Sequence, residues 1–167
     1  RIAVATKKLD AEGFSPEEGQ QYIRDLRTRL ASRDNVEMVH VSRSLEMTLM
    51  SVEPTIPVEV EAVGYTPLGT EDDRVAHNSV TPGYLEMLEI QLVRGRGLEE
   101  GDVAGAPLVA VVNETFAERL WPGEDPIGRT FQSVGQAPAG SEPATTEKRA
   151  FQVVGVAKDG KYFDFDD

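Results

Sequence analysis

The chain has 167 residues, a size that fits one large domain or two small ones. Apolar residues make up 40% of it and charged residues 28%, a globular balance that excludes wholesale disorder. Lys and Arg total 17 against 29 Asp and Glu, and the net charge of -12 argues against nucleic acid, whose phosphates are bound by clustered cations. The absence of cysteine excludes disulfides, thiolate zinc sites and cysteine nucleophiles.

We expect the given residues to include neither a signal peptide nor a membrane span. No stretch approaches the ~18 consecutive apolar residues of a membrane span, and residues 1–9 are typical of a strand rather than a signal peptide. Because the chain starts inside an expected strand and stops abruptly at 164–167, we expect it to be part of a longer protein.

A first helix is predicted after Ser15, in the run Ser15-Pro16-Glu17-Glu18. Ser15 can accept a hydrogen bond from the backbone of Glu18, Pro16 suits the first helical position, and Glu18 completes a capping box. An apolar stripe follows, made of Tyr22, Ile23, Leu26 and Leu30. The arginines expected to face water are Arg24, Arg27, Arg29 and Arg33. The stripe predicts that this helix covers one face of a sheet.

The stretch up to residue 80 is dominated by expected strands. In chain order we predict a strand at 36–41, a loop at 44–57, a half-exposed strand at 58–63, a polar turn at 69–73 and a strand at 75–80. Pro54 and Pro57 are the reason for the loop, because proline limits helix formation around it.

A second, short helix is predicted after Thr81, which is expected to cap it with Pro82 at the first helical position. The elements that follow are a strand at 90–93, a tight turn at 94–97, an acidic surface loop at 98–102 and a strand at 108–112. The last of these is a continuous β-branched run, which is typical of a strand that is covered on both faces and central in its sheet.

Asn113 is expected to cap a third helix, with Glu114 in the first turn, where negative charge suits the helix dipole. Its predicted buried face consists of Phe116, Ala117, Leu120 and Trp121, and Pro122-Gly123 ends it. The final elements are two hairpin strands at 129–134 and 151–156, joined at 135–148 by a Gly, Pro, Ala, Ser and Thr-rich segment that we expect to be a mobile loop.

The sequence offers no catalytic constellation. His40 and His77 are the only histidines, they lie on separate predicted strands, and we assign neither a metal nor a catalytic role. No Gly-x-Ser-x-Gly elbow occurs, and the run at 94–97 lacks the Gly-Lys-Ser/Thr ending of a phosphate-binding loop. Trp121 is predicted to be core rather than a partner anchor. We therefore expect a soluble α+β domain that is not an enzyme and binds no cofactor.

Carboxylates cluster at 71–73 and at 164–167. Neither cluster has the spacing or the central glycine of a calcium-binding loop, so both are interpreted as solvated charge.

Three segments carry a family pattern: Val80-Thr81-Pro82-Gly83-Tyr84-Leu85 through Arg96, Val109 through the run Trp121-Pro122-Gly123-Glu124-Asp125-Pro126-Ile127-Gly128, and Val153-Val154-Gly155-Val156. Together they resemble the MacB-like periplasmic core domain of FtsX-like ABC transporter permeases, in particular the duplicated permeases abundant in acidobacteria. The motif residues, expected to be structural, are Pro82, Gly83, Tyr84, Gly95, Arg96, Asn113, Glu114, Trp121, Pro122, Gly123, Pro126, Gly128 and Gly155.

The resemblance implies a fold with two parts. A porter-like βαβ subdomain, expected to be incomplete, would occupy residues 1–79, and a smaller Sabre-like α/β subdomain would occupy 80–167, with the chain returning toward the first part near its end. Mixed sheets with helices on one face are expected.

The resemblance also implies a function without chemistry. The domain would lie on the periplasmic side of a bacterial inner membrane and couple ATP-driven movement of membrane helices to substrate export or transmembrane signalling. Its partners would be its own transmembrane region, a second permease copy or half and, indirectly, a cytosolic ATPase, with a periplasmic adaptor, peptide, lipoprotein or drug substrate as further candidates. The alternative is a ligand-binding sensor domain of a membrane protein.

Overall fold

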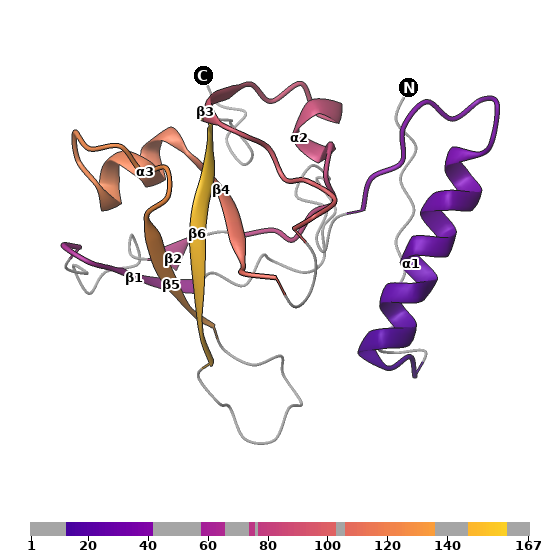
Figure 1. Ribbon diagram of the computed structural model, residues 1–167, viewed down its shortest axis with the longest axis horizontal. Coiled ribbons are helices and arrows are strands. Elements are labelled where there is room, and N and C mark those ends of the chain that lie inside the picture. The colour runs from indigo at the N-terminus through magenta and orange to yellow at the C-terminus, as the bar shows by residue number, and fades with distance from the viewer. Residues whose placement is uncertain are drawn as a thin grey trace, which may run out of the picture. The chain divides into compact units, whose positions relative to one another are not determined.

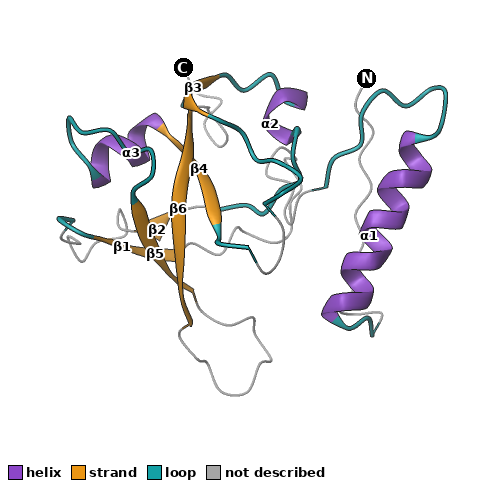
Figure 2. Cartoon of the chain, viewed as in Figure 1, coloured by secondary structure: helices purple, strands orange, loops and turns teal. Residues whose placement is uncertain are grey.

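The structure, a computed structural model, describes residues 13–41, 58–65, 74–75, 77–102, 106–135 and 147–159 (Figure 1). The chain divides into two compact units, Arg1–Val41 and Ser42–Asp167, and each is described by itself. Figure 2 shows that the described part combines helices with a sheet, so the fold is α+β as predicted.

Helix α1 (Pro16–Ala31) of the first unit begins where the capping motif predicts. The Glu18 N–H donates to Ser15 Oγ over 3.2 Å, and the Ser15 N–H donates to Glu18 Oε2 over 2.8 Å. Both halves of the capping box are therefore formed. The predicted apolar stripe is half-buried along its whole length, at Tyr22, Ile23, Leu26 and Leu30.

Two expectations for the first unit are wrong. Arg27 is half-buried rather than facing water, because it lies one helical turn after Ile23 and so sits beside the apolar stripe. Residues 36–41 form no strand, although their composition suits one. A strand requires a neighbour that pairs with its backbone, and no strand is described in this unit. The strand expected at 1–9 lies outside the described residues, so the sheet that α1 was expected to cover stays a prediction.

The second unit is built on a six-stranded mixed sheet. Its strands are β1 (Val58–Ala62), β2 (Arg74–Val75), β3 (Leu92–Gly95), β4 (Val109–Asn113), β5 (Thr130–Gly135) and β6 (Glu147–Ala157). Antiparallel pairing links them in the order β2-β1-β5-β6-β3, whereas β4 pairs with β6 in parallel. The half-exposed strand predicted at 58–63 is confirmed as β1.

Strand β6, the long yellow arrow in Figure 1, holds the sheet together. Its first half pairs with β5, from Gly135 opposite Glu147 to Thr130 opposite Gln152, which confirms the predicted hairpin. The predicted bounds are wrong, because β6 begins at Glu147, inside the segment expected to be a loop. Its second half pairs with both β4 and β3. The central position predicted for β4 is wrong, since β6 is its paired neighbour among the described strands. A continuous apolar run indicates that both faces of a strand are covered. It does not indicate how many strands pair with it.

The strands predicted at 75–80 and 90–93 are displaced in the structure. Strand β2 ends at Val75, and residues 77–79 form no strand. Strand β3 begins at Leu92 and continues through Arg94 and Gly95, which pair with β6. The tight turn predicted at 94–97 is therefore wrong, because the glycine there serves close packing between strands rather than a turn.

Helix α3 (Glu114–Leu120) packs on the sheet. Asn113 caps it as predicted, with its Oδ1 accepting the Phe116 N–H over 3.1 Å. Phe116, Ala117 and Leu120 are buried, and Trp121 is only 4% exposed, which confirms the predicted buried face. The strand residues that complete this core are Val60, Val112, Phe131, Val153 and Val156.

Helix α2 (Tyr84–Met87) confirms a short helix but not its predicted cap. The N-cap is Gly83, at φ 80 and ψ 0, with no side-chain cap bond. Thr81 instead starts a turn, in which its C=O accepts the Tyr84 N–H over 3.2 Å. Proline followed by glycine at the two central positions is the sequence of a type II turn, and that turn geometry takes precedence over the capping pattern.

Some predictions fall on residues that the structure does not describe. These are the loop at 44–57, the turn at 69–73, most of the loop at 135–148 and the carboxylate clusters at 71–73 and 164–167. The subdomain boundary at residue 79 stays a prediction, and β1 and β2 join the same sheet as the later strands.

Replacing Trp121 with alanine should remove much of the stability of the second unit. Truncating a buried aromatic side chain costs about 3–5 kcal/mol, against about 5–15 kcal/mol for a whole domain. Urea unfolding of the purified chain, followed by circular dichroism, measures the change. Val63 is 92% exposed, so Val63→Ala is the control and should stay within about 0.5 kcal/mol. Equal midpoints for the two variants would contradict the buried position of Trp121.

Candidate functional site

Two motif glycines lie where β3 and β6 pair. Gly95 and Gly155 face each other across β3 and β6. A methyl group added at Gly95 would collide with the Val154 carbonyl oxygen and lie 2.8 Å from Ile127 Cδ1. A methyl group added at Gly155 would collide with the carbonyl oxygen of Arg96. The two strands approach this closely because neither residue carries a side chain.

The segment between α3 and β5 is fixed to the same place. Pro126 is buried, and the Asp125 C=O accepts a hydrogen bond from Arg129 Nε over 2.9 Å. Gly128, at φ 80, donates its N–H to the Val153 C=O over 2.8 Å. These contacts tie the segment to the middle of β6.

Four motif residues lie on the surface near α3: Asn113, Glu114, Pro122 and Gly123. The Glu124 N–H donates to the Trp121 C=O over 3.0 Å, and Gly123 has φ 68. Pro122-Gly123 thus makes a second turn of the proline-glycine kind and ends α3 as predicted.

Arg96 and Asp102 form a bidentate ion pair, with oxygen–nitrogen distances of 2.8 and 3.0 Å. Asp102 also accepts the Glu99 N–H over 2.8 Å. Hydrogen bonds from Arg96 and from the Glu99 backbone hold the pKa of Asp102 below its usual value, and Asp102 raises the pKa of Arg96. The Asp102 side chain is only 15% exposed. The loop expected at 98–102 is therefore anchored to the end of β3 rather than fully solvated.

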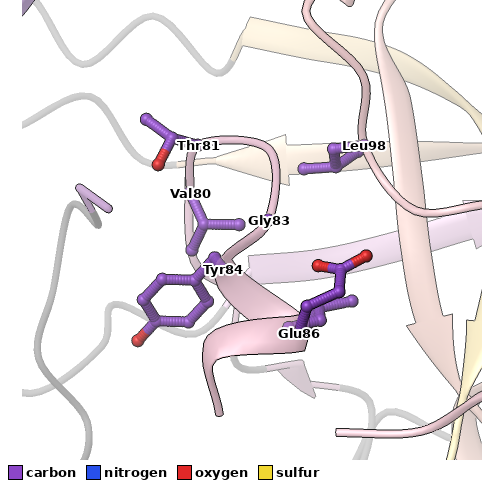
Figure 3. A pocket seen from close by; sticks show the side chains of 7 residues that line it. Val80, Thr81, Gly83, Tyr84, Glu86 and Leu98 are labelled. Carbon is purple, nitrogen blue, oxygen red and sulfur yellow. The ribbon is translucent and has the colours of Figure 1, made fainter. Parts of the chain in front are cut away.

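Gly83 and Tyr84, which follow Pro82 at the start of α2, line a small hollow (Figure 3). Val80 and Thr81 lie on one side of the hollow in this view, and Leu98 lies on the other. Its volume is about 10 Å³, room for roughly one water molecule, whereas small-molecule sites measure about 300–1,000 Å³. The hollow is too small for a peptide, lipid or drug.

Asp159 is a residue that the sequence did not single out. Its Oδ1 accepts hydrogen bonds from Asn113 Nδ2 over 2.7 Å and from the Thr115 N–H over 3.1 Å. Its Oδ2 accepts from Thr115 Oγ1 over 2.7 Å. Asp159 reaches these partners because β4 and β6 pair in parallel, which brings the C-terminal ends of both strands together. No pattern in a single sequence reveals that pairing, so the site was missed.

The described residues include no candidate metal centre. His40 is half-buried in the first unit and His77 is exposed in the second. Within the described ranges, no three His, Asp or Glu side chains are placed to hold a metal ion, and no helix there has the length and apolarity to cross a membrane. The expected lack of enzymatic activity stays a prediction.

The sequence matches a family profile over residues 7–167, and that profile describes a MacB-like periplasmic core domain. The chain belongs to this family. The resemblance inferred from the motif residues is thus confirmed, and this MacB-like domain is periplasmic or, more generally, extracytoplasmic.

Two solved structures share the fold of this MacB-like domain. The periplasmic region of MacB from Actinobacillus actinomycetemcomitans aligns with a TM-score of 0.54 at 20% identity, over 82% of this chain and 50% of that one. The extracellular domain of the noncanonic ABC-type transporter YknZ from Gram-positive bacteria aligns with a TM-score of 0.53 at 17% identity, over 81% and 57%. The chain thus spans 50% and 57% of the length of these structures. No curated protein sequence matches it significantly.

Gly155→Ala should destabilise the MacB-like domain by about 1–3 kcal/mol, the usual cost of forcing atoms into a packed site. The measurement is the free energy of unfolding in urea. Gly101→Ala is the matched control, because a methyl group at Gly101 meets nothing within 4 Å. If the two variants were equally stable, the close approach of β3 and β6 would be refuted.

The Arg96–Asp102 pair should stabilise the domain at neutral pH and lose this effect in acid. The folded-state pKa of Asp102 lies below its unfolded value, which is about 3.9. Its contribution is therefore complete above that value and disappears as the pH falls through the lowered folded pKa. The stability difference between the natural chain and Asp102→Asn, measured in urea from pH 7 downward, should shrink toward low pH. A difference that is constant with pH would contradict the shift.

Proposed function

We propose that this domain is a non-catalytic mechanical part of an ABC transporter permease. In this proposal it receives the ATP-driven movement of the membrane helices and carries it outward, to displace a substrate for export or to signal across the membrane. The support is family membership together with the fold shared with MacB and the ABC-type transporter YknZ.

The observation that carries the proposal is the way β6 binds the second unit into one body. Three other strands hydrogen-bond to β6, and α3 buries its apolar face against the same sheet. Close-packed interiors resist deformation and transmit strain. A unit built in this way moves as a whole when it is displaced, which is what transmission of movement requires.

The partners in this proposal follow from its place in a permease. They are the permease's own transmembrane region, a second permease copy or half, and a cytosolic ATPase that acts through the membrane helices. A periplasmic adaptor, a peptide, a lipoprotein or a drug would be the molecule displaced. The alternative of a ligand-binding sensor is not favoured by the hollow beside α2, which has room for roughly one water molecule.

The proposal is tested by a flexible insertion in the intact permease. About ten Gly and Ser residues, which span roughly 17 Å as a random coil, are placed directly after Asp159, where β6 has ended. The insertion should abolish export while ATP hydrolysis and the amount of protein in the membrane stay unchanged, because movement is absorbed by the linker.

The matched control places the same insertion between β5 and β6, outside both strands. This second insertion lengthens a hairpin connection and should leave export intact. Normal export with the insertion after Asp159 would overturn the mechanical proposal. A ligand that raises the melting temperature of the domain, together with normal export, would instead support the sensor.

A further inference from the structure

The C-terminal end of β6 is held from two sides. The Lys158 N–H donates to the Gln91 C=O over 2.8 Å, which extends the contact between β6 and the residue before β3. On the other side the Asp159 carboxylate accepts the three hydrogen bonds from Asn113 and Thr115 described above. These bonds join residues 44 and 46 positions apart in the sequence.

The three residues Asp159, Asn113 and Thr115 are called the Asp159 latch. All three are exposed, so the latch adds little to the core. Its acceptor is a carboxylate, and hydrogen bonds to an ionised acceptor are the stronger kind. The Thr115 N–H is one of the backbone donors that a helix start leaves without a partner inside the helix, so α3 gains from the latch as well.

The latch lies where a pull on the chain beyond β6 would act first. Strands β4 and β6 run parallel, with Asn113 opposite Ala157, so the end of β6 adjoins the residue that starts α3. Without the latch, a pull at this end would load the last strand bonds one after another and peel β6 away. With the latch, the load is shared between β6, β4 and α3.

We propose that the Asp159 latch fixes the end of β6 to α3, so that movement of the chain following Asp159 is passed to the whole second unit. This inference rests on the proposed mechanical function and names the residues that join the end of β6 to α3. Asp159 and Thr115 act as positioning residues in it, since they hold a segment in place and carry out no chemistry.

The test uses the intact permease with three substitutions. Asp159→Ala removes every latch bond, Thr115→Val removes the hydroxyl bond while keeping the shape of the side chain, and Thr115→Ser is the matched control that keeps the hydroxyl. Hydrogen exchange followed by mass spectrometry should show about five- to tenfold faster exchange over residues 153–159 for Asp159→Ala, with a smaller increase for Thr115→Val and none for Thr115→Ser.

Export should follow the same order, with ATP hydrolysis unchanged: lowest for Asp159→Ala, intermediate for Thr115→Val and normal for Thr115→Ser. Unchanged exchange in Asp159→Ala would overturn the latch itself. Faster exchange with normal export would overturn the role of the latch in transmission. The mechanical function is judged separately by the insertion after Asp159, which interrupts transmission whether or not the latch is closed.

Discussion

The pairing of β6 with three other strands is the constraint on which the second unit depends. Strands β3 and β4 have β6 as their paired neighbour in the described sheet, and β5 joins β1 to it. On one edge this pairing works only because Gly95 and Gly155 bring two backbones together where any side chain would collide. The segment that follows α3 is then bound to β6 by the hydrogen bond from the Gly128 N–H to the Val153 C=O. Gly95 and Gly155 are therefore required by the close packing of β3 against β6.

The sequence was sufficient to predict those elements that are determined by residues close together in the chain. The capping box at Ser15 and the cap at Asn113 fixed the starts of α1 and α3, because a helix start is decided by a few adjacent residues. The apolar spacing from Phe116 to Trp121 identified the buried face of α3 correctly. The hairpin of β5 and β6 was also predictable, since antiparallel strands that follow each other commonly pair.

The errors arose where the outcome depends on residues far away in the sequence. The run at 108–112 showed that β4 is a strand but not that its described partner is β6, more than 40 residues later. The run at 36–41 suits a strand, yet it forms none in a unit with no described partner strand. Asp159 was missed for the same reason, because its contacts follow from that parallel pairing. At Thr81 the error was local: a proline-glycine turn and a helix cap begin with the same residue types.

The position of β6 in the sequence also sets the order of folding during synthesis. Strands β3 and β4 leave the ribosome before the strand that pairs with them. Until residues 147–157 have been made, the backbone groups of β3 and β4 have no partner in the described sheet. The apolar face of α3 then also lacks the core residues that β6 contributes. Contacts this distant in the sequence form slowly, and exposed strand edges invite aggregation. The joining of β3 and β4 to the sheet therefore waits until β6 has been made.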